Sequence, residues 1–333
     1  MSHTHWNAPK LLEASGAYQQ SCALHAALEL DLFTTLNERP MTCQQLATAK
    51  ASSLRGMHAL LCALTALGLL VREGDLYAPC DETRKYLSRA SSHYMGHIIL
   101  HHKSLVSAWD RLAEAVRTGK PTRTSSHRTA DKEEREHFLM GMFNVATMQA
   151  QTIAAALDMH DVSRLLDLGG GPGTYAITFC QRNPTLEAVI YDLPGTRPIA
   201  ESVVAKHGLA ERVSFQEGDF LKDPITGNYD VVWISQVLHA MGPEESAGLI
   251  RKAAGTLNPG GVLYVQEFIL DGKDGAPVHP ALFGCNMLVG TDTGQVYETE
   301  ELCRMVADAG AREVDRIEIS LPQGCGIIMG CFA

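Results

Sequence analysis

The sequence predicts an α/β fold in which a doubly wound, mostly parallel seven-stranded sheet follows an N-terminal helical domain. Two observations predict it. The apolar run VSRLLDL (162–168) leads directly into the glycine cluster GGGPG and then into a helical pattern. Beyond this point, apolar strand patterns alternate with helical patterns to the end of the chain. A strand that ends in a glycine turn and faces a helix start is typical of a nucleotide-binding unit.

The composition indicates two globular domains and argues against several kinds of partner. The chain has 333 residues, 45% of them hydrophobic, and a formal net charge of −10. Nucleic acids and anionic membranes attract basic surfaces, so we expect neither as the main partner, and we expect a small-molecule ligand. No secretory signal opens the chain and the longest apolar run, 58–71, is too short to span a bilayer, so we expect a cytoplasmic protein. Nine cysteines without a C-x-x-C pair indicate buried thiols.

Residues 1–90 are predicted to form a winged-helix module. A helical spacing covers 23–36, Thr42 can cap the short helix CQQLATA, and Ser53 can cap a long helix over 54–70. Residues 71–77 then indicate a tight β-turn unit. The long helix has one arginine and is apolar nearly all round, which does not suit a DNA groove. Such a helix is better buried against a partner, most simply a second copy of the chain.

Residues 91–157 are predicted to link this module to a sheet domain over 158–333. A helix is expected over 94–112, an exposed loop over 117–135 and a strong helix over 138–157. The last helix is rich in methionine, which fills gaps in a core or lines a pocket for a flat apolar substrate.

Three histidines of the first linking helix raise the question of a metal. His97 and His101 stand four residues apart on one helix face, with His102 adjacent. No third ligand accompanies them at metal spacing, so we expect no metal site and interpret them as partly buried histidines that line a cavity.

The remaining strands of the sheet are expected between helices at 188–191, 213–215, 231–234, 262–265, 317–321 and 327–329. Ligands of such a sheet bind at the carboxyl ends of its strands.

The glycine turn itself restricts the ligand. Asp167 and the glycines at 169, 171 and 173 form a D-x-G-x-G-x-G pattern. Glycine lacks a Cβ atom, so the backbone can turn sharply and approach a ligand closely. A carboxylate before the first glycine would repel a pyrophosphate, which disfavours a nicotinamide dinucleotide and favours a cationic or zwitterionic ligand. Asp192, at the end of the next strand, is placed to accept both hydroxyls of a ribose.

These motifs resemble those of the S-adenosylmethionine-dependent O-methyltransferases of the caffeate and acetylserotonin type and their bacterial natural-product relatives. The resemblance covers essentially the whole chain. It implies a Rossmann-like class I methyltransferase domain with an N-terminal winged-helix dimerisation domain, and hence a homodimer. The matching segments are SAWDRLAEAVRTGKP, LLDLGGGPGT, YDLPG, the GDF at 218–220 and the NPGG at 258–261.

The resemblance implies S-adenosyl-L-methionine as the cofactor and S-adenosyl-L-homocysteine as its product. By the same resemblance, the glycine turn would surround the methionine part of the cofactor, Asp192 would hold the ribose, and Asp219 with Phe220 would flank the adenine. The implied cofactor-binding residues are Asp167, Gly169, Gly171, Gly173, Asp192, Leu193, Asp219, Phe220 and Ser235.

The catalytic histidine of the family falls on His239, and one of the two acids that bracket it falls on Glu267. Methyl transfer requires an aligned, deprotonated oxygen, and a histidine can serve as the general base. The second acid belongs to a G-x-E-R-T segment that reads GQVYE at 294–298, so Val296 stands where the acid is expected. The usual Asp-Trp after the histidine is Ala240-Met241.

The substrate is expected between the helix over 138–157, His239 and a helix over 281–289. The expected reaction is methyl transfer to a hydroxyl of a small aromatic or similar flat metabolite. Because of Val296, methylation of carbon or nitrogen, or lyase- or hydroxylase-like chemistry without methyl transfer, stays open. The candidate substrate-binding residues are Met140, Asn144, Met148, Met241, Asn286 and Met287.

Overall fold

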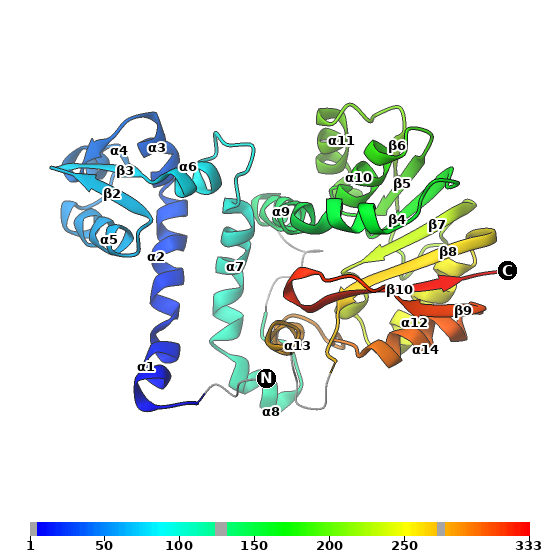
Figure 1. Ribbon diagram of the computed structural model, residues 1–333. Helices are drawn as coiled ribbons and strands as arrows, with labels where there is room; N and C mark the ends of the chain where they lie inside the picture. Colours follow the sequence, from blue (N-terminus) through cyan, green and yellow to red (C-terminus); the bar gives the residue numbers. More distant parts are fainter. Residues whose placement is uncertain (1–4, 124–131, 272–276) are drawn as a thin grey trace. The chain divides into compact units, whose positions relative to one another are not determined.

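The computed structural model describes residues 5–123, 132–271 and 277–333, and the chain divides into two compact units, 1–104 and 105–333 (Figure 1). The boundary between the two units follows Ser104 and lies inside helix α7 (Gly96–Trp109). The boundaries expected at residues 90 and 157 stay predictions.

The first unit has the winged-helix architecture that the sequence predicts. Three antiparallel strands form a small sheet in the order β1-β3-β2, and helices α2 to α6 share one apolar core with it. Phe33, Leu46 and Leu61 are fully buried in that core. The elements are α1 (Ala8–Gly16), α2 (Tyr18–Glu29), α3 (Leu32–Glu38), β1 (Met41–Thr42), α4 (Cys43–Ala49), α5 (Leu54–Ala66), β2 (Leu70–Glu73), β3 (Leu76–Pro79) and α6 (Asp81–Leu87).

Both predicted helix caps of this unit are confirmed. Thr42 and Gln45 form a capping box at the start of α4, and the Ser53 hydroxyl accepts a hydrogen bond from the amide of Gly56. Two predicted extents are wrong. The helix expected over 23–36 breaks at Asp31, whose φ of +48° lies in the left-handed region and cannot continue an α-helix. The helix expected to reach residue 70 ends at Ala66, because Gly68 turns the chain into β2.

The linking helices also differ from their predicted extents. The helix expected over 94–112 ends at Trp109, and a further helix, α8 (Leu112–Thr118), follows it. The loop expected over 117–135 therefore begins with two helical residues and ends inside α9 (Lys132–Ala156), while 124–131 lie outside the described residues.

The second unit is a seven-stranded sheet in the order β6-β5-β4-β7-β8-β10-β9. The first five strands of this order are parallel, and β10 pairs antiparallel with both its neighbours. The strands are β4 (Arg164–Leu168), β5 (Glu187–Asp192), β6 (Val213–Glu217), β7 (Tyr229–Ser235), β8 (Leu257–Phe268), β9 (Glu313–Arg316) and β10 (Cys325–Cys331).

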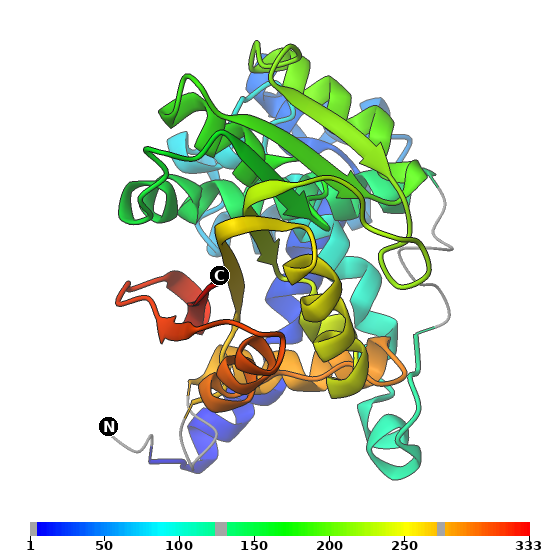
Figure 2. The same ribbon diagram turned by 90° about the vertical axis from the view of Figure 1, so that its right-hand side faces the viewer.

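Helices cover both faces of this sheet (Figures 1 and 2). One face packs on α9, α10 (Thr174–Arg182) and α11 (Arg197–Lys206), and the other on α12 (Pro243–Ala254) and α14 (Thr299–Asp308). The chain winds outward from β4 to β6 and then returns to β7 on the other side of β4. This reversal is the topological switch point of a doubly wound sheet, where ligands bind beyond the carboxyl ends of the strands.

One predicted strand is misplaced. Residues 317–321 alternate apolar and polar side chains, but the strand that pairs with β10 is β9, at Glu313–Arg316. Beyond β9, the amide of Ile317 donates one more backbone hydrogen bond, to the carbonyl of Ile327 in β10. The apolar side chains of this stretch, Ile317, Ile319 and Leu321, pack on the core, so the alternation reflects burial rather than membership of a strand.

A half-buried carboxylate, that of Asp230, ties three central strands together near their starts. Asp230 accepts hydrogen bonds from the amides of Ser163 and Arg164 at 3.0 and 2.9 Å and from the Asn258 side chain at 2.7 Å. Burial acts to raise the pKa of Asp230, but these hydrogen bonds outweigh it and hold the pKa below its ordinary value.

We expect Asp230→Ala to lower the free energy of unfolding by about 1–3 kcal/mol, because it leaves three donors without their acceptor. Urea denaturation measures this change. Asp161→Ala, which removes a fully exposed carboxylate in the same region, is the matched control. Equal stability of the two variants would contradict the bridging role of Asp230.

Candidate functional site

The glycine turn between β4 and α10 needs its glycines for two reasons. Gly169, Gly171 and Gly173 have φ values of +73°, +54° and +82°, in the region that glycine adopts without strain. A Cβ atom on Gly169 would lie 2.6 Å from a methyl group of Val237, and one on Gly173 would collide with Ile190. The turn is therefore closely packed at its first and last glycines.

The carboxyl group of Asp167 lies buried under this turn. Its Oδ2 accepts a hydrogen bond from the amide of Ala176 at 3.1 Å, and its Oδ1 has no partner among the described residues. Burial raises the pKa of Asp167 to about 7, against a lowering by the Ala176 hydrogen bond, and the nearby Asp192 charge adds to the rise. A buried carboxylate oxygen that has no hydrogen-bond partner among the described residues suits a cationic ligand group, which is the kind of ligand that the sequence pattern favours.

Asp192 at the end of β5 connects that strand to the glycine turn. Its Oδ2 accepts from the amide of Gly171 at 2.8 Å, and its Oδ1 accepts from the amide of Leu193 at 2.7 Å and from the hydroxyl of Thr196 at 3.0 Å. The acceptor proposed for a ribose is thus held in one orientation by the turn itself.

The segment after β6 closes the turn from another side. The ring of Phe220 lies 3.7 Å from the position of a Cβ on Gly169, so it is close to the first glycine. Asp219 accepts the amide of Leu221 at 3.1 Å, and Lys252 donates to the Phe220 carbonyl at 2.9 Å. Residues far apart in the sequence therefore meet around one turn.

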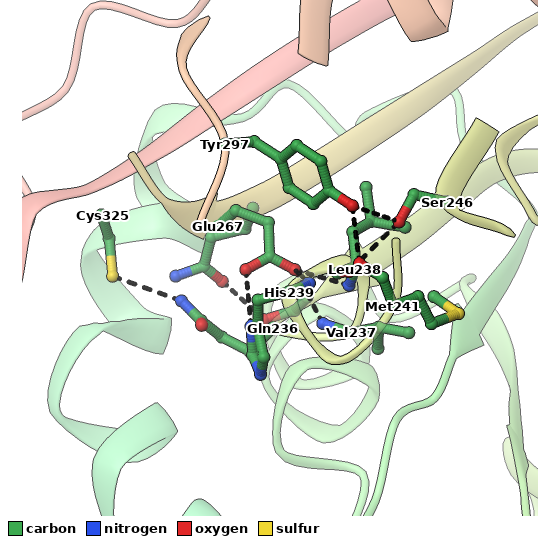
Figure 3. Close-up of polar contacts among 11 residues, drawn as sticks. Gln236, Val237, Leu238, His239, Met241, Ser246, Glu267, Tyr297 and Cys325 are labelled. Atoms are coloured by element: carbon green, nitrogen blue, oxygen red, sulfur yellow. Dashed lines mark hydrogen bonds and ion pairs between the residues drawn. The ribbon is translucent and has the colours of Figure 1, made fainter. Parts of the chain in front are cut away.

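His239 and Glu267 form a close pair at the ends of β7 and β8 (Figure 3). His239 Nδ1 lies 2.8 Å from Glu267 Oε2, and the Glu267 side chain is 1% exposed. The other carboxylate oxygen accepts the amides of Val237 at 2.8 Å and Leu238 at 2.7 Å. With a hydrogen on Nδ1 donated to the carboxylate, the Nε2 atom of His239 carries the lone pair that can accept a proton.

An aromatic wall, which we define as Phe268, His279 and Phe283, stands beside His239. The Phe283 ring meets the imidazole edge-on at 4.8 Å between centroids, and Phe268 lies 4.5 Å from Phe283. Burial lowers the pKa of His279. No motif in the sequence marks this wall, although Phe283 falls within the helix expected over 281–289, here α13 (Val278–Gly290).

Two hydroxyl groups tie down the loop that carries His239. Tyr297 donates to the Met241 carbonyl at 2.7 Å, and Ser246 donates to the Leu238 carbonyl at 3.1 Å. The two hydroxyl oxygens also lie 2.9 Å from each other (Figure 3). Each hydroxyl has one hydrogen to donate, so the two groups form one connected hydrogen-bond network with the two carbonyls. Burial raises the pKa of Tyr297 to about 12, so it stays neutral.

The structure places the other candidate residues as follows. Ser235 donates from its hydroxyl to Gln266 Oε1 at 2.8 Å, and Val296 lies against Gly284 of α13. Asn286 accepts a hydrogen bond from the indole of Trp109 at 2.9 Å.

The candidate substrate residues differ in their exposure. Met241 and Met287 are buried, Met140 and Asn144 are half-buried, and Met148 is 68% exposed.

Within 5–123, 132–271 and 277–333, no group of three His, Cys, Asp or Glu side chains is arranged to hold a metal ion. No helix in the same part of the chain is long and apolar enough to cross a bilayer.

Comparison with known proteins gives matches along nearly the whole chain. Residues 109–312 match the O-methyltransferase domain family, and residues 12–89 match the O-methyltransferase dimerisation domain family. The tetracenomycin polyketide synthesis 8-O-methyl transferase TcmO of Streptomyces glaucescens is 33% identical, over 98% of each chain. The 3-hydroxy-5-methyl-1-naphthoate 3-O-methyltransferase of Streptomyces sahachiroi is 31% identical, over 93% of this chain and 91% of that one.

A solved structure with a bound ligand is also similar. Human N-acetylserotonin methyltransferase in complex with S-adenosylmethionine is 26% identical, with a TM-score of 0.87 over 100% of this chain and 99% of that one.

We expect Tyr297→Phe to loosen the loop that carries His239, because the Met241 carbonyl loses its donor. Hydrogen–deuterium exchange of a peptide over 236–242 should become faster, while a peptide over 164–168 should be unchanged. Tyr18→Phe, at an exposed tyrosine, is the control. Unchanged exchange over 236–242 would show that the tyrosine hydroxyl does not restrain the loop.

We expect Asp167 to make the stability of the ligand-free protein depend on pH. Its folded pKa of about 7 lies above its ordinary value, so the stability it contributes is present at low pH and is lost as the pH rises through about 7. The side chain of Asp167→Asn cannot ionise, so the variant does not lose this stability. The Tm of the variant minus the Tm of the natural protein should therefore be larger at about pH 8 than at about pH 5. Thermal melts at both values measure this, with Asp161→Asn as control, and a constant difference would contradict it.

Proposed function

The chain belongs to the S-adenosylmethionine-dependent O-methyltransferase family, and from this premise we propose that it methylates a hydroxyl of a small, flat aromatic metabolite with His239 as general base. The observation that carries the proposal is the 2.8 Å contact between His239 Nδ1 and Glu267 Oε2, which leaves Nε2 to accept the proton.

The residues around the glycine turn fit the cofactor. S-adenosylmethionine supplies a methyl group on a positively charged sulfur and leaves as S-adenosylhomocysteine. The turn that excludes Cβ atoms, with the open acceptor of Asp167 beneath it, would receive the methionine part. Asp192 would hold the ribose, Asp219 and Phe220 would flank the adenine, and Leu193 and Ser235 would complete the site. These assignments extend the sequence-based prediction.

His239 and Glu267 would activate the hydroxyl together. A phenol with a pKa near 10 must lose its proton at a cost of about 4 kcal/mol at pH 7, which a nearby base offsets in part. Glu267 would hold the imidazole in the tautomer with Nε2 open and stabilise the imidazolium that forms. The same carboxylate fixes the loop through the amides of Val237 and Leu238, so the base stays in place.

The aromatic wall supports an aromatic substrate. Phe268 and Phe283 present rings beside His239, and aromatic pairs add to the stabilisation from buried area. The candidate substrate residues Met140, Asn144, Met148, Met241, Asn286 and Met287 stay a proposal, to which the exposed Met148 side chain contributes least.

Val296 favours a second candidate function. In it the protein methylates nitrogen or carbon, or uses the cofactor only as a fixed positive charge. With a valine in place of the second acid, His239 has one carboxylate partner among the described residues. A cofactor with an isotope-labelled methyl group separates these functions. Label on a product oxygen supports O-methylation, and label on nitrogen or carbon, or none in the product, overturns it.

The dimerisation domain supports a homodimer. Trp6, Leu11, Leu12 and Tyr18, in and beside α1 and α2, leave more than half of their surface exposed in the single chain. Apolar side chains gathered at one end of a chain indicate an interface, which a second copy would cover.

We expect His239→Ala to slow methyl transfer by about 10²–10⁴-fold, because it removes the general base. Binding of S-adenosylhomocysteine, measured by calorimetry, should change by less than about twofold, since the proposed cofactor contacts lie at the glycine turn. His160→Ala, at an exposed histidine, is the control. Unchanged turnover of His239→Ala would remove this residue from the mechanism.

A further inference from the structure

A lysine of α12 binds the backbone of a turn in the proposed cofactor site, and the proposed mechanism does not use it. We call residues 218–223, which follow β6, the GDF turn. The lysine is Lys252. Its Nζ atom donates to the carbonyl oxygens of Phe220 at 2.9 Å, Leu221 at 3.3 Å and Asp223 at 3.2 Å. An ammonium group has three hydrogens to donate, so these carbonyls use all of them.

The GDF turn is a single helical turn, and the three carbonyls lie where it ends. The backbone amides of Lys222 and Asp223 donate to the carbonyl of Asp219 at 2.8 and 2.7 Å. The Asp223 carboxylate accepts the amide of Asp219 at 2.8 Å. The last carbonyls of a helical turn have no partner within it, and the peptide dipoles favour a cation beside them. Lys252 therefore supplies the donors that the turn itself lacks.

The GDF turn also packs on a buried ring. A Cβ atom on Gly218 would collide with the hydroxyl of Tyr191, whose side chain is 1% exposed. Burial raises the pKa of Tyr191, and the charges of Asp223 and Asp219 add to the rise. The turn thus has two attachments to the rest of the unit, namely packing on Tyr191 and the hydrogen bonds from Lys252.

Helix α12 also contacts the loop that carries His239. Ser246, near the start of α12, donates to the Leu238 carbonyl, and Lys252 lies near its end. One helix therefore contacts the loop of the proposed base at one end and the GDF turn at the other. Side chains that are fixed on a helix position a site more precisely than side chains on loops.

We propose that Lys252 positions the GDF turn to receive the adenine of the cofactor, and that it acts through the backbone of the turn. This rests on the proposed function, which assigns Asp219 and Phe220 to the adenine. A turn that is held in place before binding does not have to be ordered by the ligand. Without the lysine, water would bind the exposed carbonyls, so the fold would persist while the turn lost its fixed position.

The first test measures binding of S-adenosylhomocysteine by calorimetry. Lys252→Met keeps the length of the side chain and removes its charge and donors. We expect it to weaken binding at least about fivefold, because the ligand must then order the turn. Lys252→Arg keeps a charge and several donors, so it should bind more tightly than Lys252→Met. Lys206→Met, at an exposed lysine that ends α11, is the matched control and should bind like the natural protein.

The second test asks where the change occurs. Hydrogen–deuterium exchange is measured without ligand, and in Lys252→Met a peptide over 217–224 should exchange faster. A peptide over 236–242 should be unchanged, since Ser246 and Glu267 still hold that loop. A thermal melt checks that each variant is folded.

Each outcome supports or overturns the positioning role of Lys252. Weaker binding in Lys252→Met, recovery in Lys252→Arg and faster exchange over 217–224 alone support it. Unchanged affinity in Lys252→Met overturns it, and so does an equal loss of affinity in Lys252→Arg. Weaker binding with unchanged exchange over 217–224, or with faster exchange over both peptides, also overturns it, because the loss then does not arise at the turn.

The proposed function fails separately. In that case the natural protein forms no methylated oxygen, while Lys252→Met still binds S-adenosylhomocysteine more weakly than the natural protein does.

Discussion

The hydrogen bonds of the Glu267 carboxylate are the constraint on which the rest of the site depends. One oxygen accepts hydrogen bonds from the amides of Val237 and Leu238 and the other contacts His239, so a single buried group orients both the backbone of the loop and the imidazole of His239. A buried carboxylate without such donors would be costly. Here the loop supplies the donors that make the charge tolerable, and the charge in turn orders the loop.

The sheet brings this pair next to the glycine turn. Parallel strands β4, β7 and β8 end at one edge, so the turn after β4 and the loop after β7 come together, with Val237 directly against Gly169. Asp192 at the end of β5 holds the turn from its other side. The proposed cofactor site at the turn and the proposed substrate site at His239 therefore share one edge of the sheet, which is the arrangement that direct transfer between them would require.

The departures from the family pattern are neighbours in space. Met241 and Tyr297 stand at positions where the family pattern has other residues. The hydroxyl of Tyr297 donates a hydrogen bond to the carbonyl of Met241. Val296, beside Tyr297, lies against α13 rather than offering a second acid. The loop of His239 is thus held by Glu267 and by neutral hydroxyl groups.

The sequence by itself determined the features that depend on neighbouring residues. The glycine turn, the caps at Thr42 and Ser53, and the parallel strands follow from local spacing, and the positions of His239 and Glu267 follow from motifs on single strands. Only the tertiary structure decided the place of β9 and the aromatic wall. Strand pairing and side-chain proximity depend on contacts between distant segments, so Phe268 and Phe283, which meet in the wall, have no common signal along the chain.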